Sequence, residues 1–123
     1  MYEVTIKKDF SAAHRLKEAG GEYEGLHGHN FVVEVTVAGT ELDQCDLLID
    51  FRILKKMTND VLDHFDHKYL NEMDFFREVN PSSEQLARYI FQSLRDKSNV
   101  PHVKLSRVTV WESEDAKVTY YND

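Results

Sequence analysis

The amino-acid sequence predicts an α+β fold, in which two helices cover one face of a four-stranded antiparallel sheet in the order ββααββ. Three observations support this prediction. Apolar and polar residues alternate in the first part of the chain, two central segments repeat apolar residues at helical spacing, and alternation returns near the end. We expect a single domain over residues 1–123, because a chain of 123 residues buries about two-thirds of its unfolded surface.

The first two strands are predicted from apolar side chains at every second position. Residues 2–12 and 30–37 show this alternation, and a polar loop around Gly20 and Gly21 separates them. The apolar row of the first segment consists of Tyr2, Val4, Ile6, Phe10 and Ala12. That of the second consists of Phe31, Val33, Val35 and Val37. Both strands are therefore expected to bury one face.

Two helices are predicted next, each with a polar cap and an apolar stripe. Asp50 supplies the first cap, and Ser82 with Gln85 matches a capping box at the second. The apolar residues of the first helix are Ile53, Leu54, Met57, Val61, Leu62 and Phe65. Those of the second are Leu86, Ala87, Ile90, Phe91 and Leu94. Pro101 ends the second helical region.

A closing hairpin is predicted from residues 103–112 and 117–121, with its turn at 113–116. The apolar parity changes between Leu105 and Val108, which indicates a β-bulge or burial on both faces. A sheet of four strands leaves two open edges. The closure of several copies into a ring is one way to cover these edges.

The composition argues against several classes of function. The formal net charge is −7 and the basic residues form no run, so we expect no nucleic-acid partner. No apolar stretch approaches the roughly 18 residues of a membrane span, and no signal peptide opens the chain, so we expect no membrane partner. Cys45 is the only cysteine, which excludes an intramolecular disulfide and fits a cytoplasmic protein.

Three histidines form the candidate metal site. His27 and His29 lie two residues apart on a strand, so their side chains point to the same face, and His14 closes the apolar row of the first strand. Three converging neutral imidazoles form a zinc site with an open fourth position, which is typical of a catalytic metal. Fe²⁺ or Ni²⁺ would also accept these ligands. A pair of surface or cross-strand histidines is the alternative without metal.

Three further groups are candidates for chemistry. Asp66 can orient His67 and raise its basicity, or the pair is an ordinary polar helix end. Glu24, three residues before His27, is either a general base near the metal or a solvated acid. Glu112 ends a strand and can accept two hydrogen bonds from a guanidine-like edge such as that of a pterin. A surface glutamate is the ordinary alternative for Glu112.

Six segments together resemble the 6-pyruvoyl-tetrahydropterin synthase family, which includes the 6-carboxy-tetrahydropterin synthases. The segments are FSAAH at 10–14, LHGHN at 26–30, LIDF at 48–51, FDH at 65–67, NPSSE at 80–84 and VWE at 110–112. The resemblance extends over nearly the whole chain. It implies a tunnelling fold (T-fold), in which three subunits close a twelve-stranded barrel and two trimers stack as a homohexamer.

The resemblance also implies a cofactor, a substrate and roles for individual residues. The cofactor is Zn²⁺, and the substrate class is 7,8-dihydroneopterin triphosphate. The implied residues are the metal ligands His14, His27 and His29, the substrate-binding residues Glu112, Ser83 and Glu84, and the proton-relay pair Asp66 and His67.

One position departs from the family pattern. Members that form pyruvoyl or carboxy products carry a catalytic cysteine four residues before the HGH motif, where this chain has Tyr23. Cys45 lies beyond the motif, and its acidic neighbours make it a poor nucleophile. Glu24 instead precedes His27 by three residues, which resembles the glutamate-type (class III) subgroup. Members of that subgroup cleave dihydroneopterin triphosphate to 6-hydroxymethyl-7,8-dihydropterin, a folate precursor.

We therefore predict a zinc-dependent pterin lyase with Glu24, Asp66 and His67 as catalytic residues. The alternative enzyme is a 6-carboxy-5,6,7,8-tetrahydropterin synthase of queuosine biosynthesis, in which Tyr23 or Glu24 replaces the cysteine. The alternative from another class is a pterin-binding or zinc-binding module without turnover.

Overall fold

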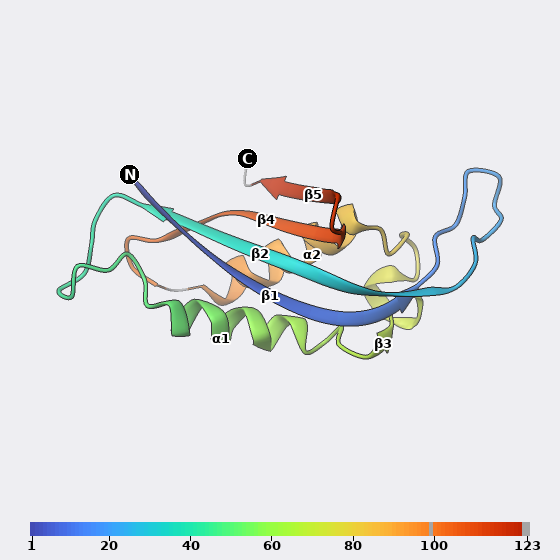
Figure 1. The fold of residues 1–123 in the computed structure, drawn as a ribbon, viewed down its shortest axis with the longest axis horizontal. Coiled ribbons are helices and arrows are strands. Elements are labelled where there is room, and N and C mark those ends of the chain that lie inside the picture. The colour runs from blue at the N-terminus through green and yellow to red at the C-terminus, as the bar shows by residue number, and fades with distance from the viewer. Residues whose placement is uncertain (99, 122–123) are drawn as a thin grey trace.

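A computed structural model describes residues 1–98 and 100–121 and confirms the α+β class. The five strands of these residues form one sheet in the order β3-β1-β2-β4-β5 (Figure 1). The strands are β1 (Tyr2–His14), β2 (His27–Gly39), β3 (Lys68–Tyr69), β4 (Lys104–Ser113) and β5 (Ala116–Tyr121). The helices are α1 (Phe51–Leu62), α2 (Ser83–Lys97) and two short 3₁₀ helices, η1 (Leu70–Glu72) and η2 (Asp74–Phe76).

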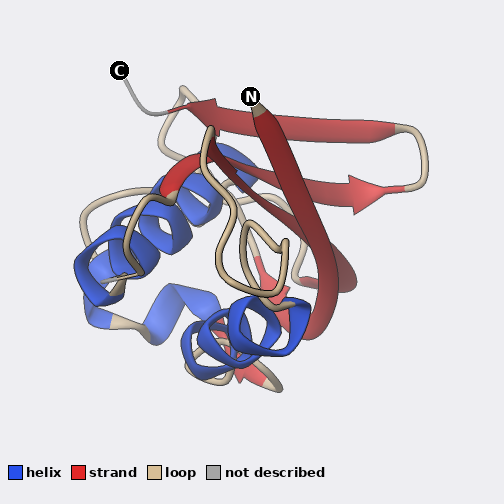
Figure 2. Ribbon diagram, turned by 90° about the vertical axis from the view of Figure 1, so that its left-hand side faces the viewer, coloured by secondary structure: helices blue, strands red, loops and turns tan. Residues whose placement is uncertain are grey.

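Both α-helices lie on the same face of the sheet, as predicted (Figure 2). Their apolar stripes and the inward-facing strand residues form the hydrophobic core between the two layers. The fully buried residues of this core include Phe31, Leu54, Phe65, Leu86, Ile90 and Val108. Neither helix in the described residues is long and apolar enough to cross a membrane.

The strands β1 and β2 form a long antiparallel pair that positions the candidate site. Tyr2 lies opposite Gly39 at one end of the pair, and His14 lies opposite His27 at the other. The burial of Phe10 shows that even-numbered residues of β1 face the helices; on β2 the odd-numbered residues do so. Both histidine-bearing strand ends therefore meet on the helix-covered face, at one end of the sheet.

The prediction of four strands was one strand short. The additional strand, β3, has two residues and pairs in parallel with Ala12 and Ala13 of β1. It follows a turn in which His67 has a φ of 59°, a left-handed conformation that is uncommon for a residue other than glycine. A strand of two residues has no alternation that a sequence pattern could reveal.

The first helix confirms the predicted cap but corrects two positions of the predicted stripe. The Asp50 carboxylate accepts a hydrogen bond from the Arg52 amide at 2.8 Å. Ile53, expected on the apolar side, is 50% exposed, because it lies about 100° around the helix from the buried Leu54. Phe65 is fully buried, but it lies beyond the helix end in the turn that leads to β3.

The second helix begins at the predicted cap, with half of the predicted capping box. The Ser82 hydroxyl accepts a hydrogen bond from the Gln85 amide at 3.2 Å. The reciprocal bond is absent among the described residues, because Gln85 Oε1 is buried without a partner. The predicted apolar stripe from Leu86 to Leu94 is buried, as expected.

The closing hairpin β4–β5 contains the predicted bulge. Thr36 of β2 pairs with Arg107, whereas the next residue, Val37, pairs with Leu105. Ser106 is therefore the additional residue, and it accounts for the change in apolar parity.

The face of the sheet opposite the helices is polar. Side-chain hydrogen bonds join Thr5 to Thr36 and Thr109 to Thr119, each at 2.8 Å. Beyond the short pairing with β3, the outer edge of β1 has no partner strand among the described residues, and neither has the outer edge of β5. The two open edges expected from the sequence are therefore present.

Candidate active site

Three histidine side chains meet where the β1–β2 pair ends. Because all three share the parity of the buried positions, their rings point toward the helix-covered face. The ring centroids of His14 and His27 are 5.0 Å apart, those of His14 and His29 are 5.3 Å apart, and those of His27 and His29 are 4.5 Å apart. The three imidazoles therefore form one compact cluster.

Backbone carbonyl groups fix the orientation of two of these rings. His14 Nδ1 lies 2.7 Å from the Pro81 carbonyl oxygen, and His27 Nδ1 lies 2.9 Å from the Gly25 carbonyl oxygen. A carbonyl oxygen only accepts hydrogen bonds, so both Nδ1 atoms carry the proton. This tautomer leaves a lone pair on each Nε2, which is the arrangement that metal-ligating histidines need.

Burial leaves histidine nitrogens of the cluster without hydrogen-bond partners among the described residues and favours the neutral form of His29. His14 is completely buried, and the Nε2 atoms of His14 and His29 lack any hydrogen-bond partner in the part of the chain that the structure describes. Burial lowers the pKa of His29, against the opposing charge of Glu112, and neighbouring His27 and His14 lower it further. A neutral imidazole is the form that binds a metal, so the environment favours the ligand form.

Glu112, at the end of β4, completes the cluster. Its Oε1 lies 3.3 Å from His14 Nε2 and 3.7 Å from His29 Nε2. One ligand atom each from Glu112 and the three histidines lies within 4.8 Å of all the others. Three imidazole nitrogens beside a carboxylate suit Zn²⁺, and the orphaned Nε2 atoms show that the residues present fit this ion.

Glu24 presents its carboxylate to the same cluster. Its Oε1 lies 3.8 Å from His27 Nε2 and accepts a hydrogen bond from the Leu16 amide at 3.1 Å. The Glu24 amide in turn donates to the Leu16 carbonyl oxygen at 3.0 Å. Both the backbone and the side chain of Glu24 are therefore bound to Leu16, just beyond the end of β1. A carboxylate held in this place can act as a general base.

A cavity of about 250 Å³ opens beside Glu112. It brings together the three residues that the resemblance assigns to substrate binding, because Ser83 and Glu84 at the start of α2 line it with Glu112. Ser83 is buried, and its hydroxyl has no hydrogen-bond partner among the described residues. The cavity thus offers carboxylates and a free hydroxyl to a polar heterocycle.

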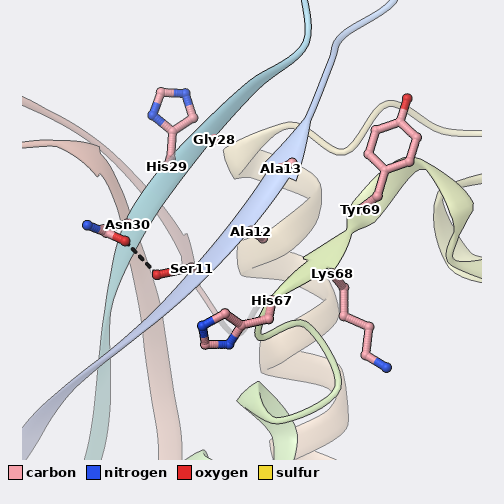
Figure 3. A pocket seen from close by; sticks show the side chains of 9 residues that line it. All are labelled: Ser11, Ala12, Ala13, Gly28, His29, Asn30, His67, Lys68 and Tyr69. Carbon is pink, nitrogen blue, oxygen red and sulfur yellow. Dashed lines mark hydrogen bonds between the residues drawn. The ribbon is translucent and has the colours of Figure 1, made fainter.

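The pair of Asp66 and His67 lies apart from the cluster. Its members contact each other, with 3.2 Å between His67 Nδ1 and Asp66 Oδ1. Ser11 of β1 fixes the turn, since its amide donates to Asp66 and its carbonyl accepts from the His67 amide. Figure 3 shows the rings of His67 and His29 on different sides of the β1 ribbon, and neither Asp66 nor His67 is among the four described residues whose ligand atoms gather in the cluster. Within one chain, the pair therefore does not reach the cluster.

His67 lines a pocket of about 490 Å³, which His29 of the cluster also lines (Figure 3). The pocket forms where small residues, Ala13 of β1 and Gly28 of β2, leave space between β3 and the hydrogen-bonded side chains of Ser11 and Asn30. His67 is 82% exposed at its side chain. It is therefore accessible to a molecule that approaches this edge of the sheet.

Comparison with known proteins identifies the family. A family model described as 6-pyruvoyl tetrahydropterin synthase matches residues 3–123. The chain belongs to the 6-pyruvoyl tetrahydropterin synthase family. The solved structure of 6-pyruvoyl tetrahydropterin synthase from Caenorhabditis elegans superimposes with a TM-score of 0.82 at 32% identity, covering 100% of this chain and 98% of the other. The subunit fold that the resemblance implied is confirmed.

Two relatives within the family carry different names. Dihydroneopterin monophosphate aldolase of Pyrococcus furiosus is 38% identical over 114 residues, which cover 91% of this chain and 90% of the relative. The 6-carboxy-5,6,7,8-tetrahydropterin synthase of Bacillus subtilis is 34% identical over 101 residues, which cover 76% of this chain and 67% of the relative. The family is one of pterin enzymes, and these names indicate at least two reactions within it.

The cysteine expected of the carboxypterin-forming family members has no substitute in this cluster. Tyr23, which occupies its position, is 52% exposed, and the Arg15 guanidinium lies over its ring at 4.5 Å from the centroid. Cys45 is exposed in the connection between β2 and α1. Figure 1 shows this connection at the end of the sheet opposite the loop that joins β1 to β2. The acidic groups beside the histidines are therefore the carboxylates of Glu24 and Glu112.

Sequence reasoning missed the backbone groups that orient the site. The carbonyl groups of Pro81 and Gly25 and the amide of Leu16 carry no signal in the identity of their residues. It also missed Asn71 and Asn80, which bind the chain on both sides of Leu16. Asn80 belongs to the NPSSE motif, and its position in that motif, next to Pro81, is the sequence feature that could have indicated a role at the site.

Proposed function

We propose that this chain is a lyase that cleaves the side chain of a phosphorylated 7,8-dihydroneopterin between its first two carbons. The products are 6-hydroxymethyl-7,8-dihydropterin and a phosphorylated glycolaldehyde. The observation that carries the proposal is the Glu24 carboxylate, 3.8 Å from His27 Nε2, beside a cluster that contains no cysteine. The name of the Pyrococcus furiosus relative, an aldolase, supports carbon–carbon cleavage.

The proposal covers two phosphorylation states of the substrate. The resemblance to the glutamate-type subgroup implies the triphosphate, whereas the aldolase relative is named for the monophosphate. The side-chain carbons that react are the same in both molecules. The length of the phosphate chain affects binding outside the cluster, so it does not alter the cleavage step.

We assign the metal to His14, His27 and His29. Zn²⁺ bound there would supply positive charge beside the substrate side chain and so lower the pKa of its hydroxyl groups. Glu112 has a separate task, because its carboxylate can accept two hydrogen bonds from the amino-pyrimidinone edge of the pterin. Ser83 and Glu84 line the same cavity and would hold that ring against β4.

Glu24 acts as the base in the cleavage step. Its carboxylate takes the proton from the hydroxyl group on the second side-chain carbon, and that oxygen forms the aldehyde carbonyl group. The bond between the first and second carbons breaks, and its electron pair moves into the carbon–nitrogen double bond of the dihydropterin ring. A proton then returns to the first carbon, which completes the hydroxymethyl product.

His67 is the candidate donor of that second proton, oriented by Asp66. Since this pair lies outside the cluster of its own chain, we propose that another copy of the chain brings it to the site. The resemblance implies a homohexamer built from two trimers. The unpaired outer edges of β1 and β5 offer the hydrogen-bonding groups through which copies could join into a barrel.

The test is the mass of the pterin product. Purified protein is incubated with zinc and either dihydroneopterin monophosphate or triphosphate, and we expect 6-hydroxymethyl-7,8-dihydropterin from at least one of them. Glu24→Gln removes the base but keeps its size, and we expect kcat to fall by about 10²–10⁴-fold while zinc stays bound. Cleavage by this variant at the wild-type rate would contradict the role of Glu24.

A second candidate is 6-carboxy-5,6,7,8-tetrahydropterin synthesis from the triphosphate. The match to the Bacillus subtilis enzyme of that name favours it. The same assay separates the two candidates, because the carboxy product differs in mass from the hydroxymethyl product. Formation of the carboxy product alone would replace our proposal with this one.

A further inference from the structure

The segment that follows β1 carries the group that holds Glu24. Residues 15–17 leave the sheet after His14, and Leu16 within them binds the Glu24 carboxylate through its amide at 3.1 Å. An amide on an unsupported loop would sample many positions. The precision with which Glu24 faces His27 therefore depends on what fixes this segment.

Two asparagine side chains fix it. Asn71 Oδ1 accepts from the Arg15 amide at 3.0 Å, and Asn71 Nδ2 donates to the Arg15 carbonyl oxygen at 2.8 Å. Asn80 forms the same two bonds with Lys17. Its Oδ1 accepts from the Lys17 amide at 2.7 Å, and its Nδ2 donates to the Lys17 carbonyl oxygen at 2.8 Å. Each side-chain amide thus pairs with one residue as a neighbouring strand would, through one donor and one acceptor.

The spacing of these bonds explains how they act on Glu24. In an extended chain, the amide and carbonyl groups of successive residues point to opposite sides. Arg15 and Lys17 direct theirs to the two asparagines, so Leu16, between them, directs its own to the other side. There its carbonyl accepts from the Glu24 amide and its amide donates to the Glu24 carboxylate.

Asn80 has a second connection to the site through the residue that follows it. The Pro81 carbonyl oxygen accepts the Nδ1 proton of His14 at 2.7 Å. The dipeptide 80–81 therefore sets both the tautomer of one histidine and the position of the segment that holds Glu24. Asn71, in η1, reaches only the segment, which makes the two asparagines separable by experiment.

We propose that Asn71 and Asn80 are positioning residues for Glu24. They clamp residues 15 and 17 so that the Leu16 amide holds the carboxylate at the cluster. This inference rests on the proposed function for its effect on turnover, since Glu24 must be the base for its position to control the rate. The clamp itself is a property of the folded chain without substrate.

The kinetic test compares Asn71→Ala, Asn80→Ala and their double variant with Asn59→Ala. Asn59 lies on α1, and its side chain forms no hydrogen bond among the described residues, so it is the matched control. We expect each clamp variant to lower kcat by about 10-fold and the double variant by about 100-fold, with little change in KM, because a misplaced base slows only the chemical step. The control should retain its kcat.

A second comparison separates positioning from a general loss of stability. In the Glu24→Gln background, Asn71→Ala should cause no further loss of kcat, because the group on which it acts is already gone. A further tenfold loss there would overturn the proposal. Zinc content per chain should equal that of the wild type in Asn71→Ala, since Asn71 contacts none of the histidines.

Amide hydrogen exchange tests the clamp in metal-free protein without any turnover. We expect the Leu16 amide to be protected in the wild type and to exchange at least about tenfold faster in the double variant, while amides of β2 keep their protection. Unchanged protection of Leu16 together with an unchanged kcat would overturn the inference. If the wild type forms no pterin product, the proposed function fails, and the exchange rates still decide whether the clamp exists.

Discussion

Two histidines of the cluster are oriented by backbone groups of residues outside the cluster. His14 is oriented by the Pro81 carbonyl group and His27 by that of Gly25, so loop conformation controls which nitrogen faces the cluster. The ligand identities were predictable, because residues two apart on a strand share a face. The carbonyl partners were not, because every residue has a carbonyl group and only the tertiary fold places one beside a ring.

At the residue scale, loss of one imidazole should weaken metal retention. We expect the wild type to hold about one zinc per chain after dialysis, and His14→Ala, His27→Ala and His29→Ala to hold clearly less, since each removes one of three nitrogen ligands. Elemental analysis of the purified proteins measures this. His64→Ala is the control, because His64 is exposed near the end of α1 and lies outside the cluster. Equal zinc in all variants would contradict the assignment.

The long elements were predictable from the spacing of apolar residues, whereas the end of α1 and the short strand β3 were not. Long elements such as α2 were predictable, because an apolar stripe and a serine cap coincide there. The end of α1 was not, since Phe65 continues the apolar spacing but is buried from a turn. The strand β3 was also missed, because its pairing with β1 depends on the left-handed turn at His67. That turn is what places the Asp66–His67 pair at the sheet edge.

Gly39, at the end of β2, gives a prediction at the element scale. A Cβ atom there would lie 2.5 Å from the His102 carbonyl oxygen and 2.7 Å from Leu48 Cδ1. Gly39→Ala should therefore destabilise the fold by about 1–3 kcal/mol, as overpacking does. Urea unfolding measures the change. Gly20→Ala is the matched control, because nothing lies within 4 Å of its Cβ position, and we expect a change below about 0.5 kcal/mol.

The ion pair between Glu3 and Arg107 predicts a pH dependence of sheet stability. Hydrogen bonds to the guanidinium at 2.8 Å and 3.2 Å lower the pKa of the Glu3 carboxyl below its ordinary value of 4.5. The contribution of this ion pair to the free energy of unfolding is therefore complete above pH 4.5, and it is lost as the pH falls through the lower, folded-state pKa of Glu3. Glu3→Gln should lower the urea midpoint slightly at pH 7, and the difference should shrink as the pH falls below 4.5 and through the lower, folded-state pKa. A difference that grew in acid would contradict this sign.

At the scale of the whole molecule, three features of the sheet bear on the proposed joining of several copies. The sheet has open outer edges on β1 and β5, its uncovered face is polar, and the Asp66–His67 pair lies away from the histidine cluster. The open edges followed from the number of strands, so the sequence anticipated them. The separation of the Asp66–His67 pair from the cluster could not be predicted from the sequence, because it depends on where β3 lies relative to the ends of β1 and β2.

Mixed oligomers test whether copies share a site. Glu24→Gln and His67→Asn should each be nearly inactive alone, since one lacks the base and the other the proton donor. After unfolding and joint refolding in equal amounts, sites that combine Glu24 of one copy with His67 of another should restore about a quarter of the wild-type activity. Copurification of two differently tagged variants shows that mixed oligomers form. Mixed oligomers without recovered activity would place both groups on the same chain.

Anomalous diffraction at the zinc absorption edge, from crystals of zinc-loaded protein with a bound dihydropterin, would show whether the metal, Glu24 and the substrate meet at the histidines. We expect one peak per chain between the Nε2 atoms of His14, His27 and His29. We also expect the Glu24 carboxylate to face the substrate side chain and the pterin ring to lie against Glu112. A peak elsewhere, or Glu112 closing the zinc coordination while the pterin lies outside the cavity, would contradict these expectations.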